Sequence, residues 1–180
     1  MKAVATLFSA LMLAAWACPA RAAPTGSAPE VIQKVVYHNN GGSADISIFI
    51  KAEIFFRRHV LGEDVTGEAN APYFNGLLDN IRNHINAVGK EHVRIAVVDH
   101  SAGVDMLKLA ITDKAIAGKL DALRADGVRF LICANTLNAR HISLGQLHGA
   151  KPEDVVPSGV AEIAALEQVG YVYILSLIHI

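Results

Sequence analysis

Short apolar runs alternate with helical patterns along this chain of 180 residues. The runs predict strands over Val31–His38, Val93–His100, Val128–Cys133 and Tyr171–Ile174. Between them, apolar residues recur with a helical period, which predicts helices over Tyr73–Val88, Val104–Ala110, Lys114–Ala125 and Gly159–Val169. This alternation predicts an α/β fold in which a parallel sheet is covered by helices on both faces.

The N-terminal residues have the layout of a secretion signal. Lys2 precedes an uncharged run from Ala3 to Cys18, and Ala20-Arg21-Ala22 supplies a small-x-small pattern for cleavage near Ala22 or Ala23. The uncharged run is shorter than the roughly 20 residues that span a bilayer. We therefore expect a signal peptide over 1–22, a linker over 23–30, a periplasmic or secreted protein, and no membrane span in the mature chain.

Removal of this leader would leave a mildly acidic chain. The whole sequence has 16 Lys and Arg residues against 17 Asp and Glu, and the leader holds two of the basic residues and no acid. No basic stripe or aromatic-basic interleaving is present, so we expect no nucleic-acid partner. The remaining length suits one compact domain, which we place over 31–174.

Polar residues follow the predicted strands where each one ends. His38 and Asn39 end the first strand, Asp99 and His100 end the second, and Cys133 with Asn135 end the third. Ligands of parallel α/β sheets bind outside the carboxyl ends of the strands, so these residues are the site candidates.

Cys133 is the only thiol of the predicted mature chain, because Cys18 lies in the leader. It can therefore form no internal disulfide. Most free cysteines are small buried hydrophobes; the alternative is a nucleophile, which must be a thiolate. A turn at Asn135–Thr136 that opens a helix near Leu137 would place a helix N-terminus beside the thiol. Arg140 could add positive charge there or bind an anionic substrate.

His38 and His100 each end an apolar strand. Each is either a capping residue bonded to a backbone carbonyl or a proton donor or acceptor near the thiol. Two histidines and a cysteine could also bind zinc or copper, but the chain has no Cys-x-x-Cys and no His-Glu-x-x-His pattern. We expect neither a metal nor a cofactor.

Segments across most of the mature chain match one family in the right order. They are Val35–His38, Asn80–Gly89, Cys133–Leu137 with Arg140, Val156–Ile163 and Gly170–Ile174. With these segments the chain resembles the DsrE/DsrF-like family of sulfur-relay proteins, particularly its small exported members.

The resemblance implies a three-layer α/β/α sandwich with a mainly parallel, about five-stranded sheet, assembled as a homo-oligomer, often a trimer or hexamer. In sulfur-transferring members, the cysteine matching Cys133 carries a persulfide between a sulfur donor and an acceptor. Here His38 and His100 would adjust protonation, while Asn135 and Thr136 would stabilise the anion. The alternatives are a non-catalytic module that binds a small ligand or metal ion, and a structural oligomer with an inert cysteine.

Three segments depart from the family pattern. The family's His-Gly-x-Gly turn is His100-Ser101-Ala102-Gly103 here, which could alter the loop facing the thiol. The apolar segment 46–73 is longer than in relatives and follows the first strand, so it could be a lid, an oligomer contact or an exposed hydrophobic liability. The string Leu175–Ile180 looks like translated sequencing adapter, and we expect it to be a non-native tail.

Overall fold

A five-stranded sheet with the order β4-β3-β2-β1-β5 forms the centre of the protein in the computed structural model, which describes residues 31–41, 55–57, 59–62 and 66–175. The strands are β1 (Gln33–Asn39), β2 (Val93–Asp99), β3 (Arg129–Cys133), β4 (Val155–Val156) and β5 (Val172–Leu175). All neighbouring strands pair in parallel. The predicted α/β architecture with a parallel sheet is therefore confirmed.

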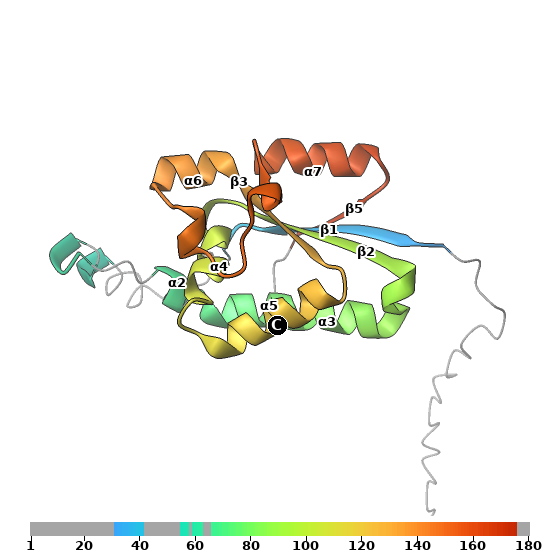
Figure 1. Ribbon diagram of the computed structural model, residues 1–180, viewed down its shortest axis with the longest axis horizontal. Coiled ribbons are helices and arrows are strands. Elements are labelled where there is room, and N and C mark those ends of the chain that lie inside the picture. The colour runs from blue at the N-terminus through green and yellow to red at the C-terminus, as the bar shows by residue number, and fades with distance from the viewer. Residues whose placement is uncertain (1–30, 42–54, 58, 63–65, 176–180) are drawn as a thin grey trace, which may run out of the picture.

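Helices cover both faces of this sheet. They are α2 (Thr66–Ala69), α3 (Ala71–Val88), α4 (Asp105–Leu109), α5 (Lys114–Ala125), α6 (Ala134–Arg140) and α7 (Gly159–Gln168). The short 3-10 helices are η2 (Lys90–His92), η3 (Ser101–Val104), η4 (Leu144–Gln146) and η5 (Pro152–Asp154). Figure 1 shows α6 and α7 on one side of the sheet and α3 and α5 on the other.

One local expectation was wrong, and one strand was not predicted. Asn135 and Thr136 do not form a turn before a helix: α6 begins at Ala134, directly after β3, with Cys133 as its N-cap. The strand β4 was not predicted from the residues, because two residues ended by Pro157 are too short for a strand pattern to show. Leu175 belongs to β5 and pairs with His38.

Several expectations fall outside the described residues. These are the leader, the linker, residues 46–54, 58 and 63–65 of the segment 46–73, and residues 176–180 of the suspected tail. Within the described residues, no helix is both long enough and apolar enough to cross a membrane.

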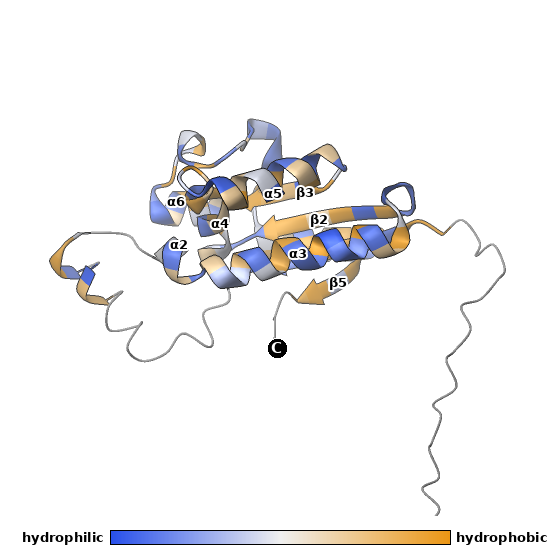
Figure 2. Cartoon of the chain, turned by 90° about the horizontal axis from the view of Figure 1, so that it is seen from below, coloured by the Kyte–Doolittle hydropathy of each residue, from blue (hydrophilic) through white to orange (hydrophobic). Residues whose placement is uncertain are grey.

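The two faces of the sheet carry cores of different size. Alternation along β1 directs Val35 and Tyr37 into the larger core under α3 and α5, and Val36 into the smaller core under α7. Figure 2 shows β2 and β5 as largely hydrophobic and α3 as striped, as expected for a helix with one face on the core. The same alternation decides on which face each polar residue at the strand ends lies.

Candidate active site

Side chains from four adjacent strands form a row on the α7 face, which we call the thiol row: Cys133, His100, His38 and Tyr173. Cys133 ends β3, His100 follows β2, His38 lies in β1 and Tyr173 in β5. The His38 ring lies between its neighbours, 5.7 Å from the ring of His100 and 6.0 Å from the ring of Tyr173 (centroid distances). The fold thus brings together the predicted residues Cys133, His38 and His100 and adds Tyr173.

Cys133 is buried, with 2% of the residue exposed, and hydrogen-bond donors of Gly159, Thr136 and Asn135 act on its sulfur. Burial alone raises the pKa of the thiol. The backbone N–H groups of Gly159, Thr136 and Asn135 and the Thr136 hydroxyl act against burial and hold the pKa below its ordinary value. Because these donors come from the first turns of α6 and α7, both helix dipoles favour the thiolate.

Gly159 allows the first turn of α7 to approach the thiol closely. A Cβ atom at this position would lie 3.2 Å from Cys133 Cβ, 3.1 Å from Val98 Cγ1 and 3.4 Å from His100 Cβ. Any side chain would therefore crowd the site and push its backbone N–H away from the sulfur. The sequence showed Gly159 only as the start of a helix, because its contact with Cys133 depends on the undetected strand β4 before it.

His38 and His100 each have one buried ring nitrogen without a hydrogen-bond partner in the described part of the chain, namely His38 Nε2 and His100 Nδ1. The other nitrogen of His38, Nδ1, lies 3.0 Å from the hydroxyl oxygen of Tyr173. Burial and the neighbouring His100 lower the pKa of His38, so its ring is neutral at pH 7. Neither histidine is a simple cap.

Thr136 and Arg140 attach α6 to the turn that follows β2. The Ser101 N–H donates to Thr136 Oγ1 (3.0 Å), and the Ser101 carbonyl accepts from Arg140 (3.1 Å). Ser101 has φ 55°, a left-handed conformation that favours glycine, and glycine is the residue of the family pattern at this position. The two bonds from α6 hold the serine in this conformation. The turn of His100-Ser101-Ala102-Gly103 thus keeps a glycine-like backbone at Ser101.

The side chains of the remaining predicted site residues are engaged elsewhere, are exposed or lie on the other face. The side chain of Arg140 is paired with Asp105 at 2.7 Å. Asn135 is exposed and reaches the sulfur through its backbone only. Asn39 and Asp99 are fully buried, and Asn39 Nδ2 donates to Asp99 Oδ1 (2.7 Å) and to the Gly103 carbonyl (3.1 Å). The backbone of Asn39 and Gly103 is so close that Gly103 has no room for a side chain.

Asp99 is a neutral acid in this environment. Burial raises the pKa of its carboxyl group to about 8, although the Asn39 bond and Arg124 act in the opposite direction. No group of three or more His, Cys, Asp and Glu side chains suited to a metal ion is present among the described residues.

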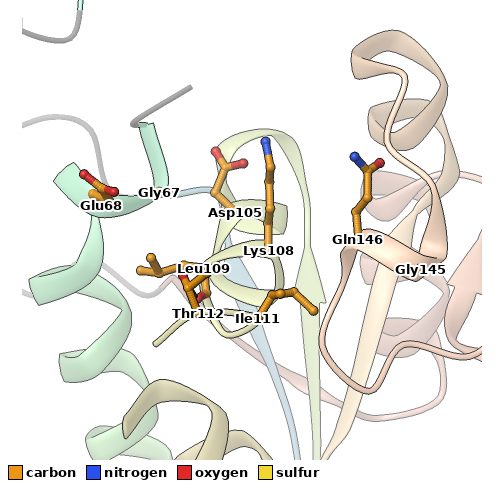
Figure 3. Close-up of a pocket in the computed structure, with 9 residues that line it drawn as sticks. All are labelled: Gly67, Glu68, Asp105, Lys108, Leu109, Ile111, Thr112, Gly145 and Gln146. Atoms are coloured by element: carbon orange, nitrogen blue, oxygen red, sulfur yellow. Dashed lines mark hydrogen bonds between the residues drawn. The ribbon is translucent and has the colours of Figure 1, made fainter. Parts of the chain in front are cut away.

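A cavity of about 400 Å³ lies apart from the thiol row, between α2, α4 and η4. In Figure 3 the polar ends of Glu68, Asp105, Lys108 and Gln146 gather along one rim, above Leu109. The Asp105–Arg140 pair links its wall to α6, the helix that follows Cys133, but its lining includes neither Cys133 nor the two histidines.

The comparisons with known proteins show the family of this chain. The profile of the DsrE/DsrF-like family matches residues 69–175, which include Cys133, Gly159 and Tyr173. The chain belongs to the DsrE/DsrF-like family. This membership confirms the resemblance and suggests a role related to sulfur relay.

One solved structure, titled "Structure of Protein of Unknown Function MTH1491 from Methanobacterium thermoautotrophicum", is 28% identical to the chain. The alignment covers 79% of this chain and 98% of that one, with a TM-score of 0.49. No curated protein shows significant similarity to the chain.

Proposed function

We propose that this protein carries sulfane sulfur as a persulfide on Cys133 and transfers it to an acceptor thiol. The observation that carries the proposal is the set of donors around the Cys133 sulfur, from Gly159, Thr136 and Asn135. Such donors stabilise an anionic sulfur, whether a thiolate or a persulfide, without a cofactor. Membership of the DsrE/DsrF-like family supports the same chemistry.

The proposed reaction is a pair of displacements at sulfur. The Cys133 thiolate attacks the outer sulfur of a donor R–S–SH, the donor S–S bond breaks, and R–S⁻ leaves and takes up a proton. The product is Cys133–S–SH. An acceptor thiolate then attacks its outer sulfur, and Cys133 leaves as the thiolate that began the cycle. Sulfane sulfur is moved between thiols, so no external oxidant or reductant is needed.

The histidines and Thr136 have different roles in this proposal. Thr136 donates to the sulfur and holds the neighbouring turn through Ser101. His100 is next to Cys133 across Gly159, so it accepts the thiol proton and returns it to the leaving group. Because Cys133 is 2% exposed, we expect the first donor to be a small compound such as a polysulfide.

Intact-mass spectrometry after brief exposure of the folded protein to polysulfide tests this proposal. We expect a gain of about 32 Da per sulfur atom that reductant reverses and that maps to Cys133. Cys133→Ser should fold and gain no mass. Uptake that persists in Cys133→Ser, or no uptake by the folded wild-type protein, would contradict the proposal.

We also propose that the protein is exported and acts as a homo-oligomer, with a sulfur donor or acceptor protein as a further partner. The leader pattern over 1–22 supports export. The edge strand β5 supports self-association, because Val172 and Leu175 are exposed there at 64% and 40%. Light scattering should show a trimer or hexamer that Val172→Asp weakens; a monomeric wild-type protein would contradict this part.

A further inference from the structure

Among the described residues there are two hydrogen-bonded tyrosine–histidine pairs, one on each face of the sheet. Tyr37 Oη lies 2.9 Å from His84 Nδ1, and Tyr173 Oη lies 3.0 Å from His38 Nδ1. In the first pair, His84 Nε2 also bonds the side-chain oxygen of Gln33 at 3.0 Å. An amide oxygen only accepts, so His84 carries its proton on Nε2 and accepts from Tyr37 at Nδ1.

The second pair repeats this arrangement but leaves the far nitrogen open. His38 Nε2 is buried and has no partner within the described part of the chain, and the same holds for Nδ1 of the adjacent His100. Buried polar atoms in folded proteins are nearly always hydrogen-bonded. Two such atoms on neighbouring rings, in the row that ends at Cys133, indicate a place where a polar group of a ligand is received.

Tyr173 determines whether His38 Nε2 is an N–H donor or a bare nitrogen that accepts. Burial raises the pKa of Tyr173, and Glu167 raises it further, so the phenol keeps its proton at neutral pH and can donate it. Burial and His100 lower the pKa of His38, so its ring is neutral and has one N–H group. A bond donated by Tyr173 to Nδ1 places that N–H at Nε2.

We propose that Tyr173 is a positioning residue that fixes His38 as an N–H donor, and that this donor binds the anionic end of the small sulfur compound that Cys133 attacks. The second half rests on the proposed function and narrows its substrate to an anionic sulfur chain, such as a polysulfide. The first half is a property of the protein without any substrate.

The tautomer of His38, read from ¹⁵N chemical shifts and long-range ¹H–¹⁵N couplings, tests the first half. We expect Nε2–H in the wild-type protein and a mixed or Nδ1–H state in Tyr173→Phe. Tyr37→Phe is the matched control, because it removes the equivalent bond on the opposite face and should leave His38 unchanged. The Nδ1–H tautomer of His38 in the wild-type protein, or the same tautomer in Tyr173→Phe as in the wild-type protein, would overturn the positioning role of Tyr173.

Two rates measured on the same variants test the second half. In Tyr173→Phe, sulfur uptake from polysulfide should fall by roughly tenfold, the expected loss for one hydrogen bond to a charged group. Alkylation of Cys133 by iodoacetamide, a neutral reagent, should stay within about twofold of the wild-type rate. His38→Gln, which keeps an N–H donor, should retain more uptake than His38→Ala.

The outcomes separate this inference from the proposed function. Uptake by Tyr173→Phe at the wild-type rate, or equal losses of uptake and alkylation, would overturn the binding role of His38. A wild-type protein that takes up no sulfur would overturn the proposed function and the binding role together. The tautomer measurement would still decide the role of Tyr173.

Discussion

The carboxyl edge of the sheet carries polar side chains on both faces, and the side chains of the two faces differ in their hydrogen bonds. On the α4 side, Asn39 and Asp99 are fully buried, and the amide of Asn39 bonds both Asp99 and the backbone of Gly103. On the α7 side, His38 Nε2 and His100 Nδ1 have no partner among the residues that the structure describes. On the α4 side the same holds for Asp99 Oδ2, but the other oxygen of this carboxyl group is held by Asn39.

This difference separates a structural network from a reactive one. The Asn39–Asp99 pair joins β1, β2 and the turn after β2 through short, buried bonds, so its contribution is to hold the backbone. At one end of the thiol row, Gly159, Thr136 and Asn135 offer donors to the Cys133 sulfur, and the other end, Tyr173, is 38% exposed. Substitutions on the first face should therefore change stability, and those on the second should change thiol chemistry.

Gly103→Ala should have the largest effect, and it should be on stability. The new Cβ would lie 2.0 Å from the Asn39 carbonyl oxygen, so the backbone must move; we expect a loss of about 3 kcal/mol. Gly118→Ala, with no atom within 4 Å of its Cβ, is the matched control and should gain up to about 1 kcal/mol. Urea unfolding measures both. Equal stability of the two variants would contradict the structural role of this face.

Asp99→Asn should change how stability depends on pH. The folded-state pKa of Asp99 is about 8 against 3.8 for the free group, so the folded protein binds the extra proton between these values. The stability contributed by the neutral acid is full below pH 4 and is lost as the pH rises through 8. The variant should lack this decline, with a difference on the order of 2 kcal/mol between pH 5 and 8. Parallel curves from urea unfolding would contradict the assignment.

Gly159→Ala, on the α7 face, should change the pKa of the Cys133 thiol. Crowding against Cys133 and Val98 should cost about 1–2 kcal/mol and raise the pKa of the thiol, because the N–H at this position moves off the sulfur. Val160→Ala, at an exposed position next in α7, is the control. Ultraviolet absorbance of the thiolate against pH reports the pKa. An unchanged pKa in Gly159→Ala would show that this donor does not act on the sulfur.

Ser101→Gly should have the smallest effect. Because Ser101 has φ 55°, glycine relieves backbone strain, and both backbone bonds to α6 remain possible. We expect a gain of about 0.5–1 kcal/mol in urea unfolding and no change in the thiol pKa. A clear loss of stability would mean that the serine hydroxyl has a role that the backbone bonds do not explain.

The sequence predicted the parts of the fold that depend on local pattern. Apolar runs and helical periods located β1, β2, β3, β5 and the longer helices to within a few residues. They also placed Cys133, His38 and His100 at one edge, because parallel strands end together. Which face each polar residue occupies required the register, and this register separated Asp99 from the thiol.

Other features had no local signal. The contact of Gly159 with Cys133 depends on β4, and the bond of Tyr173 to His38 joins residues 135 positions apart. The pairing of Arg140 with Asp105 likewise joins α6 and α4, and sequence spacing alone did not indicate it. Long-range contacts of this kind follow from the assembled sheet.

The most direct test of the reactive face is the rate of Cys133 alkylation in the folded protein as a function of pH, measured with iodoacetamide and without denaturant. We expect single-site modification at Cys133 with a midpoint below the value of about 8.5 for a free cysteine. Modification only at urea concentrations that unfold the protein would contradict the account, because the thiol would then be a buried and inert part of the core.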